Sequence, residues 1–244
     1  MDETENAHPI DLRNTFPARR ALLEDQEKGG EDFAAPLGSS RNGRLRFTNG
    51  AHQVVVRADS HLRSLYRARF GDRMPTIWVR GGAVTIRYPR FPACDWTGCR
   101  SERPAEVALN ARIPWDIEVR GGTSRLVADL REMRIGSLRV EGGASRIEVA
   151  LPAPAGTLTV LIFGGASNVA FRRPEGVAAR LRVEGGVTNL EFDDRRIGAA
   201  GREMDLRTRD YEDAVDRYYV AVTGGANNLS VYEQHDMTDS GTSK

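Results

Sequence analysis

The sequence predicts a mainly β domain, in which coils of about 21 residues stack into a β-solenoid-like structure with a Gly-Gly corner in each coil. Three observations lead to this fold class. A short segment recurs along the chain, apolar and polar residues alternate on both sides of it, and the copies are almost evenly spaced. A β-sandwich or a β-barrel is the alternative architecture.

The recurring segment is centred on a pair of glycines. Its clearest copy runs from Val140 to Val149 and reads VEGGASRIEV. A weaker copy at 47–54 has Asn49-Gly50 in place of the glycine pair. The complete pairs, predicted to be structural corners, are Gly81-Gly82, Gly121-Gly122, Gly142-Gly143, Gly164-Gly165, Gly185-Gly186 and Gly224-Gly225.

The alternation on the two sides of the glycines is out of step. Leu138 and Val140 precede the pair at even positions, whereas Ile147 and Val149 follow it at odd positions. One continuous strand cannot give this pattern, because successive side chains point to opposite faces. The glycines therefore predict a corner, a bulge or a tight turn, and an ordinary two-residue hairpin is the simplest alternative.

The spacing favours stacked coils over independent hairpins. First glycines fall at 121, 142, 164 and 185, which are steps of 21 or 22 residues. The outer steps, 81 to 121 and 185 to 224, are close to double, so each is expected to contain an extra coil without a glycine pair. Alternation at 107–111 predicts a strand of the first extra coil, and 195–214 is expected to be a charged loop.

The chain is predicted to form one domain. The repeats place the β domain at 43–232, with a flexible N-terminal segment at 1–42 and a flexible tail at 233–244. Within the first segment, 17–27 could form a short helix. The stretch 61–70 breaks the alternation and is expected to be a loop or short helical turn. Its arginines and aromatics could bind phosphate or RNA, but a solvated loop with its aromatics in the core is favoured.

Composition excludes several classes of function. The net charge is +1, with 28% charged residues. The chain therefore lacks the excess of basic residues that would indicate a nucleic-acid partner. No apolar run reaches the roughly 18 residues of a transmembrane segment, and the N-terminus has no apolar signal core. A cytoplasmic protein is the expectation.

No catalytic constellation is legible. The chain has four histidines and two cysteines, Cys94 and Cys99, and no nucleophile–base pair or complete ligand set for a metal. Free thiols are expected at the two cysteines, with a redox pair or a metal site as alternatives. We therefore predict no catalytic residues, no metal, no cofactor and no enzyme activity.

Polar residues form columns beside the glycines. In the five copies from Gly121 onward, the third residue after the first glycine is serine, threonine or asparagine, and the next residue is arginine or asparagine. Stacked hydroxyls and amides are expected to hydrogen-bond between coils, which is a structural role. An exposed polar ladder could also bind a sugar or a peptide. The candidate binding residues are Arg125, Arg146, Asn168, Asn189 and Asn228.

The glycine segments resemble the bacterial adhesin-like β-repeat family that includes LiaF-like and toast-rack type domains of envelope-stress proteins. The resemblance is carried by GGAS at 142–145 and 164–167, and by its variants GGTS at 121–124, GGVT at 185–188 and GGAN at 224–227. It covers roughly 45–232. It implies a non-enzymatic regulatory or interaction module of bacteria.

These inferences predict a scaffold or interaction module, acting in a bacterial stress-response or regulatory complex. Two alternatives stay open, a bactofilin-like self-assembling protein and a carbohydrate-active β-helix enzyme with carboxylates converging in a groove. The partner is expected to be a protein or a second copy of the chain. We expect the coil at Phe47–Val56 and the strand at Leu229–Tyr232 to be the exposed ends, where self-association would give a homodimer.

Overall fold

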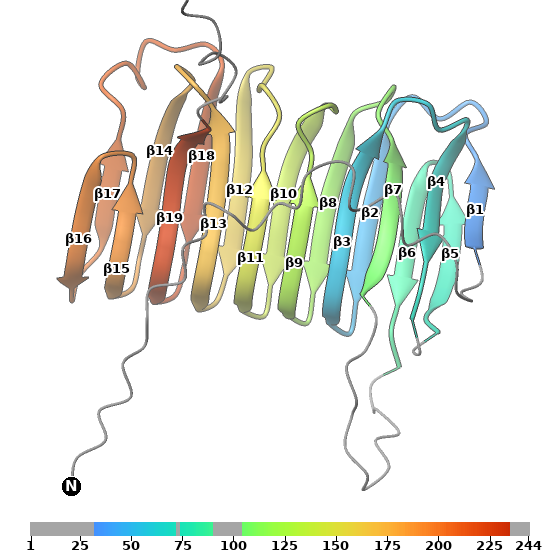
Figure 1. Cartoon of the computed structure of the whole chain (residues 1–244), viewed down its shortest axis with the longest axis horizontal. Coiled ribbons are helices and arrows are strands. Elements are labelled where there is room, and N and C mark those ends of the chain that lie inside the picture. The colour runs from blue at the N-terminus through green and yellow to red at the C-terminus, as the bar shows by residue number, and fades with distance from the viewer. Residues whose placement is uncertain (1–31, 72–73, 90–103, 235–244) are drawn as a thin grey trace, which may run out of the picture. The chain divides into compact units, whose positions relative to one another are not determined.

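The computed structural model of the chain describes residues 32–71, 74–89 and 104–234. All regular elements in these residues are β-strands, nineteen of them in two sheets (Figure 1). This confirms the predicted fold class. The tails, the helix predicted at 17–27 and both cysteines lie outside the described residues.

The two sheets, A and B, are of mixed parallel and antiparallel type. In order across the sheet, the ten strands of sheet A are β1 (Asp32–Pro36), β4 (Ser64–Arg69), β7 (Ala105–Asn110), β3 (Ala51–Asp59), β9 (Thr123–Asp129), β11 (Ala144–Ala150), β13 (Ala166–Pro174), β19 (Ala226–Gln234), β15 (Val187–Phe192) and β16 (Arg195–Ala200). The nine strands of sheet B are β17 (Met204–Arg207), β14 (Ala178–Val183), β18 (Arg217–Val222), β12 (Thr157–Phe163), β10 (Ile135–Glu141), β8 (Trp115–Arg120), β2 (Gly43–Thr48), β6 (Ala83–Arg87) and β5 (Thr76–Arg80).

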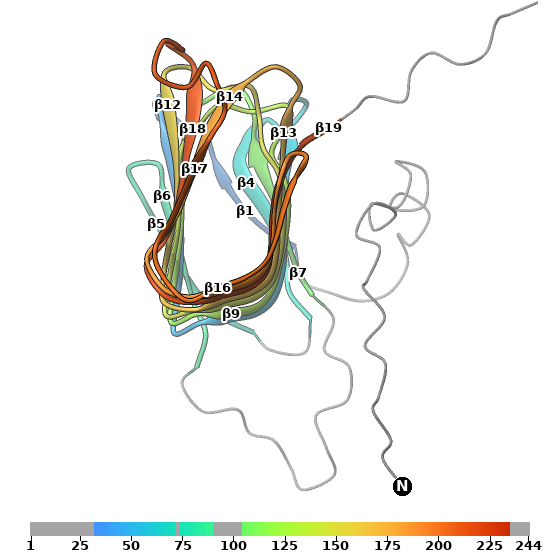
Figure 2. The ribbon, with the colours of Figure 1, turned by 90° about the vertical axis from the view of Figure 1, so that its left-hand side faces the viewer.

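Six coils form the regular part of the stack. In each coil a strand of sheet B passes through a corner into a strand of sheet A, and the pairs are β2–β3, β8–β9, β10–β11, β12–β13, β18–β19 and β14–β15. Figure 2 looks along the stack and shows two walls joined by a rounded base. Equivalent residues are in register, so that Val140 lies between Val119 and Ile162, and all three are buried. The predicted apolar columns therefore form the core.

Successive corners lie directly against one another, as the spacing predicts. A Cβ atom added at Gly121 would lie 2.5 Å from the backbone nitrogen of Gly50, and one at Gly164 would lie 2.9 Å from that of Gly143. Contacts this short exclude any side chain, and the backbone at both glycines is also left-handed, with φ of +91° and +122°.

The corner predicted at Gly81-Gly82 is wrong. Here the chain stays in sheet B, because β5 and β6 pair antiparallel with Arg80 opposite Ala83. The two glycines form the intervening turn with φ of +55° and +80°, as a two-residue hairpin of type I′ requires. The alternative hairpin interpretation therefore holds for this one pair, because the same dipeptide suits both turns.

The coils do not stack in sequence order. The C-terminal coil, β18–β19, lies between β12–β13 and β14–β15, so β19 pairs with both β13 and β15. The doubled step from 185 to 224 therefore contains no extra coil. Much of the predicted charged loop instead forms β16 and β17, which pair antiparallel with β15 and β14 and cover that end.

At the other end, the predicted strand at 107–111 is present as β7, which ends at Asn110. It pairs with β3 and with β4, and β4 occupies most of the stretch 61–70 that we expected to be a loop or helical turn. Tyr66 and Phe70 are buried in the core, in agreement with the favoured interpretation of this stretch.

The limits of the β structure are wider than predicted. The first described strand begins at Asp32 rather than 43, because β1 adds an edge strand whose Phe33 and Ala35 pack on the core. The last strand, β19, continues to Gln234 rather than 232, because it pairs with β13 up to Pro174. Both predicted ends of the stack are interior, since β3 lies between β7 and β9 and β19 lies between β13 and β15.

Candidate functional site

The predicted binding column forms a ridge just after the corners. Arg146, Asn168, Asn228 and Asn189 have left-handed backbones, with φ of +61°, +54°, +52° and +53°, whereas Arg125 is not among the residues with positive φ. The left-handed residue interrupts each ladder, so Ser145 pairs with Ser167 and the register resumes at Ile147 and Val169. The change of face is therefore completed here, a few residues after the glycines.

The three asparagines form a hydrogen-bonded ladder. The Nδ2 of Asn189 donates to the Oδ1 of Asn228 at 2.9 Å, and the Nδ2 of Asn228 donates to the Oδ1 of Asn168 at 2.9 Å. Beside them, the Thr188 hydroxyl donates to the Oδ1 of Asn227 at 3.0 Å. This confirms hydrogen bonding between coils, although the order 168–228–189 follows the inserted coil. Asparagine is favoured at this position for two reasons. It tolerates the left-handed region of backbone conformation, and its side-chain amide hydrogen-bonds to the asparagine of the next coil.

Arg146 is an exception on this ridge. It is the one residue other than Asn, Asp or Gly with positive φ among the described residues, and its side chain is exposed. Arginine gains nothing from a left-handed backbone, which costs about 1–2 kcal/mol for ordinary residues. The structure thus accounts for the asparagines, and it leaves binding by Arg125 and Arg146 a prediction.

A second feature lies on the outer face of sheet B, over the neighbouring strands β18, β12 and β10. Leu161 and Phe163 of β12 and Tyr219 and Ala221 of β18 point outward there, because their inward neighbours fill the core. Phe163 is 39% exposed, and the guanidinium of Arg139 on β10 lies 5.5 Å from its ring centroid. We call Leu161, Phe163, Tyr219, Ala221 and Arg139 the central patch.

Ion pairs flank the central patch on both sides. On the side of β8 and β2, Glu118 accepts from the Nε of Arg46 at 2.7 Å and from the Nε of Arg120 at 2.5 Å. Burial opposes ionisation of Glu118, but the two arginines outweigh it and hold its pKa below the usual range. On the side of β14, Arg180 pairs with Asp205 at 2.5 Å. Ion-paired side chains therefore border the central patch on both sides.

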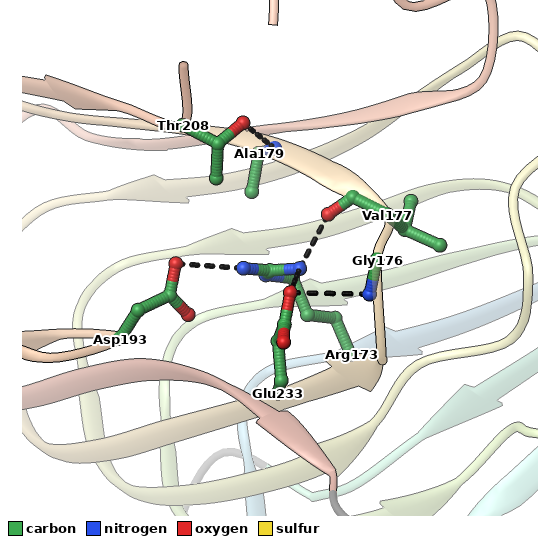
Figure 3. A network of polar contacts seen from close by, with 7 residues as sticks. All are labelled: Arg173, Gly176, Val177, Ala179, Asp193, Thr208 and Glu233. Carbon is green, nitrogen blue, oxygen red and sulfur yellow. Dashed lines mark hydrogen bonds and ion pairs between the residues drawn. The ribbon is translucent and has the colours of Figure 1, made fainter. Parts of the chain in front are cut away.

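A third feature is a buried charge cluster at the far ends of β13 and β19 (Figure 3). Arg173 is 1% exposed and lies among partners from neighbouring coils. Its Nη2 donates to Asp193 and its Nη1 to Glu233, both at 2.7 Å, and Nη1 also donates to the carbonyl of Val177. Glu233 in turn accepts from the backbone nitrogen of Gly176 at 3.2 Å.

The cluster connects the inserted coil to both of its neighbours. Arg173 belongs to β13, Glu233 belongs to β19, and Asp193 directly follows β15. Burial raises the pKa of the Asp193 carboxyl, and the negative charge of Glu233 adds to this rise. The positive charge of Arg173 lowers the pKa but only partly offsets the effect of burial. One arginine therefore pairs with two carboxylates and joins the inserted coil to the coils on either side of it.

Two of these features were missed by sequence reasoning, although alternation contains a signal for each. Arg173 has the same parity as the buried Val169 and Phe171, so it had to point inward. Phe163 has the opposite parity to the buried Val160 and Ile162, so it had to point outward. A charge at an inward position and an aromatic ring at an outward position are the informative exceptions.

The remaining chemistry gives no site. Cys94 and Cys99 lie outside the described residues, and within residues 32–71, 74–89 and 104–234 no group of three His, Cys, Asp or Glu side chains could hold a metal ion. The same residues contain no helix long and apolar enough to span a membrane.

The repeated corner and the parallel walls agree with comparisons to known proteins. Residues 81–172 match the family model described as the N-terminal domain of toast_rack, DUF2154. The resemblance to toast-rack type domains is confirmed. No curated protein gives a significant match to the chain.

Solved structures support the same fold. A candidate cell adhesion protein from Clostridium sporogenes aligns with a TM-score of 0.64 and 15% identity, covering 84% of this chain and 99% of that protein. At this identity the likeness shows the fold alone. A candidate adhesin from Bacteroides fragilis aligns with a TM-score of 0.23 and 4% identity over 86% of this chain and 98% of that protein, which is too low to support an argument.

We expect Arg146→Asn to stabilise the protein by about 1 kcal/mol, because asparagine tolerates the left-handed backbone and would lie next to Asn168. Arg125→Asn is the matched control at the equivalent position without positive φ, and it should give no such gain. Urea unfolding of both variants measures the difference. Equal effects in the two variants would contradict the account of this column.

We expect Arg173→Met to destabilise the protein by about 3 kcal/mol, because it leaves two partly buried carboxylates side by side without the cation that pairs with both. Arg180→Met removes an arginine from a more exposed pair and should cost less than about 1 kcal/mol. Chemical unfolding followed by circular dichroism compares the two. A loss at Arg173 no larger than that at Arg180 would show that the cluster does not stabilise the inserted coil.

Proposed function

We propose that this chain is a non-enzymatic interaction module that binds a protein partner through the central patch of sheet B. The observation that carries the proposal is the half-exposed Phe163 at the corner end of β12, which is stacked by Arg139 and has ion-paired strands on both sides across the sheet. Protein interfaces combine an apolar, aromatic and arginine-containing centre with a polar rim, and this face has that composition.

The rigidity of the face supports the same role. Strands β10, β12 and β18 pair in parallel through five or more successive residues, and their inward side chains are fully packed. A surface held in this way keeps its shape on binding and loses little conformational entropy. Ordered side chains such as Phe163 can then act as an anchor for a partner.

The charged groups favour binding over catalysis. In the carbohydrate-active alternative, two carboxylates would converge on a groove and remain free to exchange protons. Glu118 is instead held ionised between two arginines, and Asp193 and Glu233 share the buried Arg173. These carboxylates have arginine partners that fix their geometry, which is the behaviour of a structural ion pair.

The biological setting is part of the proposal. The toast-rack match and the fold shared with a candidate adhesion protein support a role in a bacterial regulatory or stress-response complex. Cytoplasmic localisation stays a prediction. Self-association as a homodimer is the second part of the proposed function, and it would use a surface other than the central patch.

Photo-crosslinking tests the proposed surface. A benzophenone side chain would replace Phe163 in one variant and Val215, which is 82% exposed, in the control. We expect one cellular protein to be linked from position 163 and not from 215. With that protein purified, Phe163→Ala should raise the Kd at least tenfold, and Val215→Ala should leave it unchanged.

Two results would contradict the proposal. One is the same set of linked proteins from both positions, which indicates non-specific contact. The other is a purified partner whose affinity Phe163→Ala does not change.

A further inference from the structure

The two sheets end unevenly on the N-terminal side of the stack. Beyond the β2–β3 coil, sheet A continues through β7, β4 and β1, whereas sheet B continues only through β6 and β5. Among the described residues, β1 therefore has no strand facing it in sheet B (Figure 1). At the opposite end each sheet has one additional strand, β16 or β17, so only one end has this step.

Exposed apolar side chains gather at the same step. Of the five large hydrophobic side chains that are exposed in the described residues, three belong to β5 or the loop before it. Met74 and Trp78 are each 48% exposed, and Val79 is 41% exposed. Val79 is paired in register with Val84, which is fully buried, so Val79 faces the core layer and is exposed because no strand lies beyond it.

The backbone of β5 is also unpaired on its outer side. Its one ladder partner in the described chain is β6, so one row of N–H and C=O groups from Thr76 to Arg80 has no strand beside it. Within residues 32–71, 74–89 and 104–234, β1 likewise has one ladder partner, β4, and its other edge has no strand beside it. Such edges accept another strand readily.

The directions of the strands restrict what can fill the step. β2 and β3 run oppositely, because they are the two arms of one coil. β6 is parallel to β2 and β5 is antiparallel to β6, so β5 runs with β3. β7 is parallel to β3, β4 is antiparallel to β7, and β1 is antiparallel to β4, so β1 also runs with β3. The two edge strands, β1 and β5, therefore run in the same direction.

We propose that this stepped end is a self-complementary interface between two copies of the chain. A twofold axis parallel to the strands exchanges the two sheets and preserves strand direction. It places β1 of each copy in the open position beside β5 of the other copy. Sheet A of one copy then continues as sheet B of the other, on both sides of the dimer. The interface is isologous and closes at two copies.

A second copy fits this step better than an unrelated strand. Sheet A extends beyond sheet B by one strand, β1, and the open position next to β5 in sheet B is also one strand wide. A single twofold rotation therefore fills this position in both copies. A twofold axis perpendicular to the sheets would instead pair β5 of one copy with β5 of the other. In that arrangement β1 of one copy would occupy the position of β4 of the other, and this clash excludes it. The edges at the other end suit strand addition less well, since β17 has four residues and β16 begins with two exposed arginines.

This interface deepens the self-association part of the proposed function and rests on it. It uses surface separate from Phe163, so partner binding and dimerisation can fail independently. Sedimentation of the full chain at micromolar concentrations should show a dimer. Val79→Lys should raise the dimer Kd at least tenfold, because a charge would enter the apolar step. Val215→Lys adds the same charge at an exposed site and should leave the Kd unchanged.

A cross-link identifies the geometry. A benzophenone at position 79, in an equal mixture of isotope-labelled and unlabelled chains, should link to the peptide that contains Asp32–Pro36 of the other chain. A monomer at all concentrations, an open-ended polymer, a dimer indifferent to Val79→Lys, or an intermolecular link elsewhere would each overturn the proposal. If the dimer forms in this way but binds no partner at Phe163, the proposed dimer interface is supported and only the proposed function of the central patch is contradicted.

Discussion

The structure depends on backbone-to-backbone contact at the stacked corners. Neighbouring strands in a sheet are separated by about 4.8 Å, and a corner must keep this spacing while the chain turns. Side chains at the corner would hold the coils apart, since a Cβ at Gly224 would lie 2.5 Å from the carbonyl oxygen of Gly164. The glycine pairs thus set the distance on which the ladders of both walls and the apolar columns rely.

The same constraint makes the coils interchangeable. Because each corner presents similar backbone to its neighbours, a coil can lie beside any other coil that has the same register. The C-terminal coil exploits this, with its Ala226 paired in register to both Ala166 and Val187. Specific contacts are then needed to fix the order, and both the asparagine ladder and the ion pairs of Arg173 link the inserted coil to its two neighbours.

Much of the fold could be predicted from the sequence, because periodicity reports directly on local geometry. Alternation and spacing identified the strands of the six coils, the buried columns and the polar ladder, but not the edge strands β1, β4, β16 and β17. They could not identify the order of coils, since the segments around Gly164, Gly185 and Gly224 carry the same pattern and differ only in long-range contacts. Gly81-Gly82 was misassigned because a type I′ hairpin and a corner both favour two glycines.

The candidate site was harder to predict for a related reason. The sequence identified the asparagine column but not its left-handed backbone. Asparagine is favoured both by hydrogen bonding between coils and by a positive φ, so its presence does not distinguish the two. Arg173 and Phe163 were recognisable only as departures from the alternation, and their meaning depends on partners far away in sequence. The proposed function rests on one of these exceptions, Phe163, whereas the repeats describe the scaffold that holds it.

The central claim is that the last coil is inserted between two coils that are adjacent in sequence order. It can be tested by amide–amide nuclear Overhauser effects in deuterated protein, which report strands that lie side by side. The account predicts contacts from the segment around Leu229 to those around both Val169 and Leu190, and none directly between the latter two. A direct contact between the segments around Val169 and Leu190, with Leu229 at one edge, would contradict it.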